Sequence, residues 1–115
     1  MALKRIILEM GTGNDLYGED YTKAATRAVQ DALHHSSITL FRSLDLDREA
    51  MQVTVTVGVQ KPDEIDVARV AAEFPHGQIT VKPVFGGLNI EDKEHGTVTV
   101  IATVGVDARY DIPGQ

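Results

Sequence analysis

The segment from Gln52 to Val59 constrains the fold most strongly, because every second residue in it is valine and the residues between are polar or glycine. Successive side chains of a β-strand point to opposite faces of a sheet. The valines, Val53, Val55, Val57 and Val59, therefore form one apolar face, and the opposite face carries Thr54, Thr56 and Gly58. A chain that contains this strand must place other apolar residues over the valine face.

Two predicted helices supply that cover. The first begins at Tyr21 after an N-cap at Asp20, and it is expected to end at His34-His35-Ser36-Ser37. Its apolar residues recur at helical spacing: Tyr21, Ala24, Ala25, Ala28, Val29, Ala32 and Leu33. The second is expected to run from a cap at Asp63 to about Phe74, and Pro75-His76-Gly77 then ends it.

Three further strands are predicted, at Lys4 to Met10, Gln78 to Val84 and Thr97 to Val106. Pro83 cannot donate a backbone hydrogen bond, so the strand that contains it is expected at a sheet edge or a bulge. The residues from Gly86-Gly87 through Gly96 are expected to form an irregular loop, and the tail from Tyr110 is expected to be loose.

This order predicts an α+β fold over residues 1–115, a single domain with the sequence β-α-β-α-β-β. We expect a two-layer sandwich in which two helices cover one face of a four-stranded mixed sheet, with the last two strands forming an antiparallel hairpin. The second face of the sheet is rich in threonine and glycine. It is either a solvated surface or an interface between subunits.

Composition excludes several classes of function. The chain has 115 residues, a net charge of −6 and no cysteine. An acidic chain is poorly suited to bind nucleic acid or anionic membranes, because both interactions depend on lysine and arginine. Without cysteine there are no disulfides, zinc–thiolate sites or thiol nucleophiles. The start of the chain does not resemble a signal peptide, and a cytoplasmic location is expected.

The segment from Gly11 to Gly18 is the predicted binding loop, because three glycines and short polar side chains lead into the first helix. It lacks the dinucleotide-binding and phosphate-loop fingerprints, since Leu16 replaces the third glycine and Gly18-Glu19-Asp20 replaces a Gly-Lys-Ser ending. The predicted ligand contacts are Gly11, Thr12, Gly13, Asn14 and Asp15. The alternative interpretation is a tight turn with one capping aspartate.

Three residues are candidates for catalysis: Lys23 and Lys82, which could activate a hydroxyl, and Ser37, which lies beside two histidines. Each also has a structural interpretation, as a surface lysine or a serine that ends a helix. Asn14 and Asp15 offer too few oxygens for a cation without other ligands. We expect neither a bound metal nor a cofactor.

The run Ile7 to Gly18, followed by Asp20 to Ala25 and Ala32 to Ser37, resembles a small conserved hypothetical family named after a Listeria open reading frame. That family has a Gly-x-Gly-x-Asp-x-His-Gly signature and no established activity. Gly11, Gly13, Asp15 and Gly18 match it, and Tyr17 stands at the histidine position. The resemblance implies that Tyr17, whose phenol can form hydrogen bonds, contacts a ligand.

Thr12-Gly13-Asn14 and Asp20-Tyr21-Thr22-Lys23 are also similar to a repeat of the ring-opening amidohydrolases, the cyanuric acid hydrolase and barbiturase group. The glycine hairpin Phe85-Gly86-Gly87-Leu88 is similar as well. Those enzymes place three related units around a shared site. The resemblance therefore implies that Gly86 and Gly87 contact ligand and that a homotrimer, or a multiple of three, assembles the site. The Ser–Lys pairs of that group have no counterpart at Met10, Phe85 or Gly86.

Two functions remain open from the sequence. One is binding or hydrolysis of a small polar ligand, such as a cyclic amide, at a site between subunits; an enzyme of this kind would act on non-peptide C–N bonds. The other is a non-catalytic module for ligand binding or oligomer assembly. Both imply a homo-oligomer.

Overall fold

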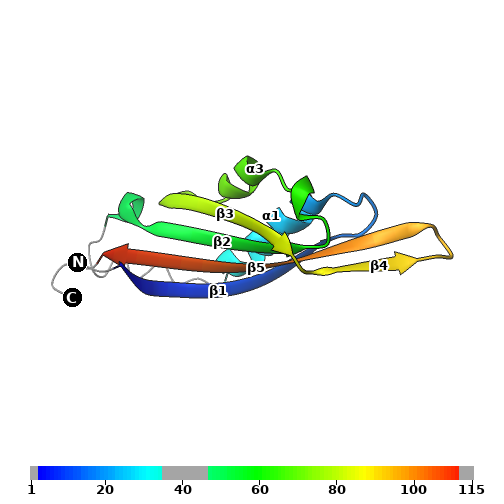
Figure 1. Ribbon diagram of the computed structural model, residues 1–115, viewed down its shortest axis with the longest axis horizontal. Coiled ribbons are helices and arrows are strands. Elements are labelled where there is room, and N and C mark those ends of the chain that lie inside the picture. Colours follow the sequence, from blue (N-terminus) through cyan, green and yellow to red (C-terminus); the bar gives the residue numbers. More distant parts are fainter. Residues whose placement is uncertain (1–2, 35–46, 112–115) are drawn as a thin grey trace.

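A mixed sheet of five strands lies beneath two α-helices in the computed structural model, which describes residues 3–34 and 47–111 (Figure 1). The strands are β1 (Leu3–Asp15), β2 (Gln52–Val59), β3 (Gln78–Phe85), β4 (Leu88–Asp92) and β5 (Thr97–Asp111). The helices are α1 (Tyr21–His34) and α3 (Val67–Ala71), and short 3-10 turns occupy Arg48–Ala50 and Pro62–Glu64. The predicted α+β fold is confirmed, with one strand more than expected.

The strand order is β1-β5-β2-β3, and β4 pairs with β5 beyond the end of β2. β2 and β3 are parallel, whereas β5 is antiparallel to β1, β2 and β4. β3 therefore lies at an edge of the sheet, which is where Pro83 predicted it. The hairpin of β4 and β5 extends along the long axis of the molecule, away from the start of β1 and the end of β5 (Figure 1).

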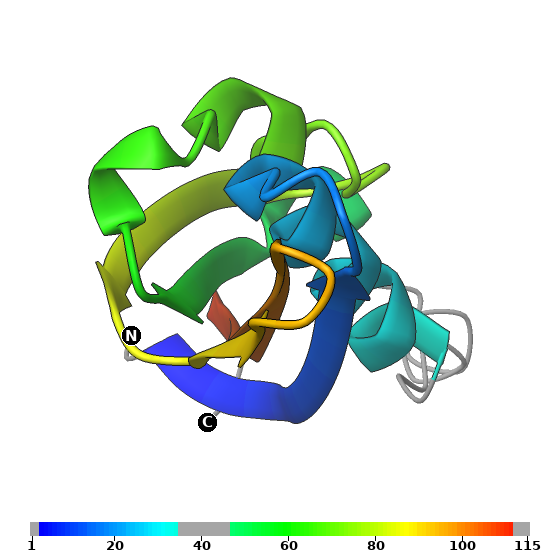
Figure 2. The ribbon, with the colours of Figure 1, turned by 90° about the vertical axis from the view of Figure 1, so that its right-hand side faces the viewer.

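The core lies between the helices and the valine face of the sheet. Val53, Val55, Val57 and Val59 are all at most 2% exposed, which confirms the alternation seen in the sequence. α1 packs over β1 and β5, and α3 packs over β3, so that both helices lie on one side of the sheet (Figure 2). Alanines on α1 bring it close to the strands, since all four of Ala24, Ala25, Ala28 and Ala32 are fully buried.

The second predicted helix is interrupted, and its cap is not Asp63. Pro62–Glu64 forms a 3-10 turn, Ile65 is extended, and α3 begins after Asp66, whose Oδ1 accepts a hydrogen bond from Arg69 N–H at 3.3 Å. The Thr22 hydroxyl holds the break in place. It accepts from Asp66 N–H at 2.9 Å and donates to Glu64 C=O at 3.3 Å. α3 therefore begins after Asp66 and not after the predicted cap at Asp63, and it ends at Ala71, before the predicted end near Phe74.

The region predicted as an irregular loop contains β4, which pairs with β5 from Leu88 opposite Ile101 to Asp92 opposite Thr97. The hairpin is therefore formed by β4 and β5, whereas β3 pairs with β2, contrary to the predicted hairpin of the two last strands. The first two residues of the predicted tail, Tyr110 and Asp111, belong to β5. β5 continues to Asp111, and the hydroxyl of the buried Tyr110 accepts a hydrogen bond from Asp47 N–H at 3.0 Å.

In the described ranges, no helix has the length and apolar character needed to cross a membrane. The predicted end of the first helix beyond His34, including Ser37, falls outside the described residues, as does the chain after Asp111.

Candidate functional site

The glycine-rich segment is mostly strand, so the prediction that a loop begins at Gly11 is wrong. β1 continues to Asp15, and Gly11 and Gly13 face α1. A Cβ atom at Gly13 would lie 2.3 Å from Ala28 N, and one at Gly11 would lie 2.3 Å from Ala28 O. These glycines are therefore required by the close packing of α1 on β1.

Asp15 anchors the turn that joins β1 to α1. Its side chain is buried, and Oδ2 accepts a hydrogen bond from Asp20 N–H at 2.9 Å. Lys23 Nζ lies 3.7 Å and Arg27 Nη1 lies 4.0 Å from its other oxygen. Asp20 caps the helix as predicted, since Oδ1 accepts from Lys23 N–H at 3.0 Å. Asp15 and Lys23 thus have structural partners on the helix side of the sheet.

Side chains of α1 also form hydrogen bonds with backbone groups at the outer edge of β1. Asp31 Oδ2 accepts from Thr12 N–H at 3.0 Å, and Arg27 Nη1 donates to Asn14 C=O at 2.7 Å. Tyr17, in the turn, is 75% exposed. The structure therefore separates the predicted ligand residues, because Asp15 points toward the helix while Tyr17 points to solvent.

A groove of about 600 Å³ lies on the opposite, open face of the sheet. It contains three of the predicted ligand residues, Gly11, Thr12 and Gly86. The remaining lining residues were not predicted as site residues: Met10, Asp31, Thr56, Gly58, Val84, Phe85, Thr103, Val104 and Gly105. The signal in the sequence was the set of threonines and glycines that alternate with buried valines.

Strand register places these residues in two rows across the sheet. One row, from β1 to β3, is Met10, Gly105, Thr56 and Lys82; the next is Thr12, Thr103, Gly58 and Val84. Lys82, predicted to be catalytic, is thus beside the groove, whereas Lys23 is on the other side of the sheet with Asp15.

Glycine makes the floor of the groove. A Cβ atom at Gly105 would meet nothing within 4 Å, so the space above this residue is open. At Gly58 the same atom would lie 2.9 Å from Thr103 Oγ1. Three threonine hydroxyls provide donors and acceptors there. The lining contains no serine, cysteine or histidine, so a nucleophile of the predicted kind is missing from the described groove.

The glycine hairpin has a structural role beside the groove. Gln60 Nε2 donates to Gly86 C=O at 3.0 Å and to Gly87 C=O at 3.1 Å. Gly87 has a φ of +61°, and a Cβ atom there would lie 2.2 Å from Ile101 O. Gly87 is therefore fixed by the turn into β4, and it does not line the groove that Gly86 lines.

Large apolar side chains surround the groove and continue along the hairpin. Met10 is 73% exposed, Phe85 75%, Leu88 57% and Ile90 51%. By register, Leu88 lies beside Ile101 and Ile90 beside Thr99, on the same face as the groove. Exposed apolar residues gathered in this way are typical of interaction sites.

Charge is concentrated at the other end of the open face. Asp107 accepts hydrogen bonds from Arg109 Nε at 3.0 Å and from Arg5 Nε at 2.9 Å. The hydrogen bond from Arg109, with a smaller contribution from Arg5, lowers the pKa of Asp107 below its ordinary value. The hydrogen bond to Asp107 in turn raises the pKa of Arg109 above its ordinary value. This cluster is paired within the chain and lies in the row next to the groove, because Asp107 is opposite Leu8 and Thr54.

Comparison with known proteins identifies a family and similar solved structures. No curated protein matches the chain. The crystal structure of an FtsZ-like protein of unknown function from Nostoc punctiforme PCC 73102 is similar, with 30% sequence identity and a TM-score of 0.84 over 97% of this chain and 99% of that one. Residues 5–108 match the Lin0512 family, described as a conserved hypothetical protein. The chain therefore belongs to the Lin0512 family.

Proposed function

We propose that the protein associates with further copies of itself through the open face of its sheet, and that the groove on this face holds a small polar ligand between subunits. The observation that carries the proposal is the exposure of Met10 and Phe85 at the groove, 73% and 75% respectively. A ligand bound to one chain would remain largely in water. A second copy would cover both the ligand and these apolar side chains.

The distribution of charge favours a second copy as the partner. The chain carries a net charge of −6, so two copies repel one another unless acidic residues stay out of their contact. Neither of the two groove rows contains an acidic residue, and the next row, Asn14, Ile101 and Leu88, contains none either. The acidic residues beside these rows have partners within the chain: Asp31, which also lines the groove, accepts from Thr12 N–H, and Asp107, in the row of Leu8 and Thr54, accepts from Arg5 and Arg109. The three rows can thus meet their equivalents with few like charges opposed.

The dimensions of the molecule are sufficient for such a contact. It is 59 Å long and 18 Å across its narrowest dimension. A face of that size has the same order of area as the roughly 800 Å² that each partner contributes to a stable interface. Three copies would agree with the resemblance to the three-unit amidohydrolases, whereas two copies would meet in a symmetric face-to-face contact.

The groove suits a ligand with hydrogen-bond acceptors and an apolar part. Thr12, Thr56 and Thr103 line it with their hydroxyls, and Val84 provides an apolar wall. Lys82, opposite Thr56 in the strand register, adds a cationic side chain at its edge. A small carboxylate or a cyclic amide has this chemistry. Among the described residues of the groove there are hydroxyls but no imidazole to activate one, so the proposal is limited to binding.

Assembly without a ligand is the second candidate, and the open space over Gly105 favours it. Met10 lies next to Gly105 across the β1–β5 pair and projects from the surface. In a face-to-face contact, the Met10 side chain of one copy could fill the space above the glycine of the other. The groove would then be an interface hollow that closes on association.

Light scattering coupled to size exclusion tests the association. The unchanged protein is expected to have the mass of an oligomer, and Met10→Asp is expected to be a monomer because it places a charge in the contact. Val67→Asp is the matched control, since Val67 is a 46% exposed apolar residue on α3, on the helix side. A monomeric unchanged protein, or equal loss of mass in both variants, would overturn the proposal.

Ligand binding needs a separate measurement on the oligomer. Thr56→Val and Thr103→Val remove a groove hydroxyl while keeping a β-branched side chain of similar size. Calorimetry with small carboxylic acids and cyclic amides is expected to show binding to the unchanged protein and weaker binding to both variants at unchanged mass. Absence of binding with the oligomer intact would favour the second candidate.

A further inference from the structure

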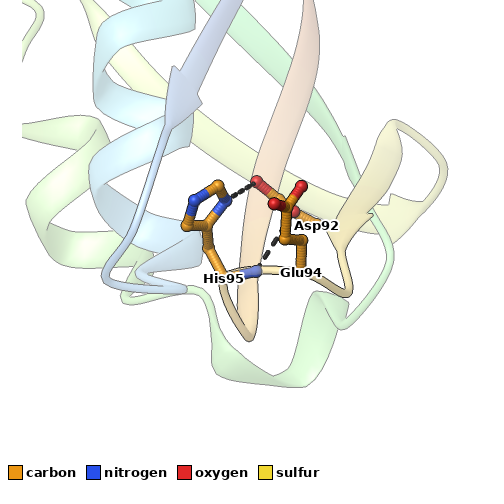
Figure 3. Close-up of side chains that lie close together, drawn as sticks. All are labelled: Asp92, Glu94 and His95. Atoms are coloured by element: carbon orange, nitrogen blue, oxygen red, sulfur yellow. Dashed lines mark hydrogen bonds and ion pairs between the residues drawn. The ribbon is translucent and has the colours of Figure 1, made fainter.

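The geometry points to a site for a divalent transition-metal ion at the tip of the β4–β5 hairpin, formed by Asp92, Glu94 and His95 (Figure 3). This site lies farther along β5 than the groove, because Asp92 pairs with Thr97 whereas the groove contains Thr103, and it does not depend on the function proposed above. The irregular loop expected between Gly86 and Gly96 gave no indication of it, because the three side chains converge only when the hairpin forms.

The three donor groups are already close together. One ligand atom from each lies within 4.8 Å of the other two. His95 Nδ1 is 2.8 Å from Asp92 Oδ2, and the other oxygen of Asp92 accepts from His95 N–H at 3.3 Å. Two donors bound to one tetrahedral zinc ion, each about 2.1 Å from it, are about 3.4 Å apart. An ion can therefore sit between Asp92 and His95 after a small movement.

The hairpin holds the ligands on a short, closed piece of backbone. β4 and β5 pair up to Asp92 and Thr97, immediately on either side of the turn. Gly96 closes the turn with a φ of +66°, a conformation that glycine adopts without strain. The side chains of Asp92 and His95 remain 52% and 69% exposed, so the rest of the coordination shell is open to water or another ligand.

The donor set selects the class of ion. Calcium and magnesium prefer oxygen ligands alone, whereas an imidazole nitrogen with two carboxylates suits zinc, nickel or copper. The neutral imidazole would bind the ion through Nδ1 with its proton on Nε2, in place of the hydrogen bond to Asp92. The carboxylates of Asp92 and Glu94 would balance the charge of the ion.

A second histidine–carboxylate pair provides an internal comparison. His76 Nδ1 lies 2.7 Å from Glu49 Oε1, at nearly the same separation as the hairpin pair. In the described part of the chain, no third histidine, aspartate or glutamate completes a cluster there. If zinc binding requires three converging ligands, zinc is expected to bind the hairpin cluster more tightly than the His76–Glu49 pair.

Titration of the full chain with Zn²⁺ by calorimetry is the test. His95→Ala is expected to weaken binding by roughly tenfold or more, because it removes the nitrogen ligand. Two controls are expected to bind as the unchanged protein does. Glu91→Gln removes a negative charge from the same hairpin without removing a ligand, and His76→Ala removes the two-ligand pair.

Each outcome decides the proposal. Loss of binding in His95→Ala alone, with circular dichroism unchanged, supports it. Equal weakening in Glu91→Gln would show diffuse attraction to an acidic hairpin, and loss in His76→Ala would place the ion elsewhere. Either result, or no binding by the unchanged protein, would overturn it.

Discussion

The two faces of the sheet use glycine for opposite reasons. On the helix side, Gly11 and Gly13 are needed because the backbone of α1 occupies the space where a side chain would be. On the open side, a Cβ atom at Gly105 would have no other atom within 4 Å, and the missing side chain leaves a hollow. A glycine-rich pattern thus marks close packing in one region and an accessible groove in the other.

The test with the largest expected effect replaces one glycine with alanine on each face. Gly13→Ala would place a Cβ atom 2.3 Å from Ala28 N, and backbone cannot move aside as a side chain can. We expect a loss of about 3 kcal/mol or more in the free energy of unfolding, measured by urea denaturation. Gly105→Ala is the control and should change that free energy by less than about 1 kcal/mol. Equal losses of unfolding free energy in the two variants would refute the contrast between the two faces of the sheet.

A second test concerns the buried carboxylate of the helix side. Asp15→Ala removes the acceptor of Asp20 N–H and leaves Lys23 and Arg27 without their nearest carboxylate. We expect the free energy of unfolding to fall by about 2 kcal/mol. Asn14→Ala is the control, because Asn14 contacts Arg27 through its backbone carbonyl, which alanine retains. If Asp15→Ala kept full stability but lost ligand binding, the turn that contains Asp15 would be the binding site, as the sequence predicted.

A smaller effect is expected for the equivalent carboxylate of the open side. Asp107 also has two cationic partners, Arg5 and Arg109, but its own side chain is 21% exposed, whereas that of Asp15 is 7% exposed. Because water screens such pairs, Asp107→Asn should lower the free energy of unfolding by about 1 kcal/mol or less. A loss larger than that of Asp15→Ala would show that burial does not explain the difference between the two faces.

The smallest effect is the pH dependence that Asp107 contributes. Its pKa is lowered in the folded chain, so its stabilising contribution is complete above the ordinary aspartate pKa of about 3.9 and is lost as the pH falls through the lower folded value. Denaturation between pH 5 and pH 2, in steps, should therefore show a steeper loss for the unchanged protein than for Asp107→Asn. Parallel curves would mean that Asp107 is not preferentially ionised in the folded state.

Local patterns predicted much of the fold because they report local geometry. The valines of β2 and the apolar residues of α1 follow the periods of a strand and a helix, and the structure confirms both. The prediction of the site was less accurate. Gly11, Thr12 and Gly86 line one groove, but Gly13 and Asp15 serve the packing of α1, and Lys82 is beside the groove by strand register alone.

Local patterns in the chain were enough to predict the α+β class, the amphipathic β2 strand, the α1 helix with its Asp20 cap, and an edge or a bulge at Pro83. Packing between distant segments set where β1 ends, that Leu88–Asp92 is a strand, and which residues share the groove. The two kinds of feature differ in the sequence distance over which their causes act. Periodicity and capping depend on neighbours within a few residues, whereas the meaning of a glycine or a short polar segment depends on which distant element packs against it.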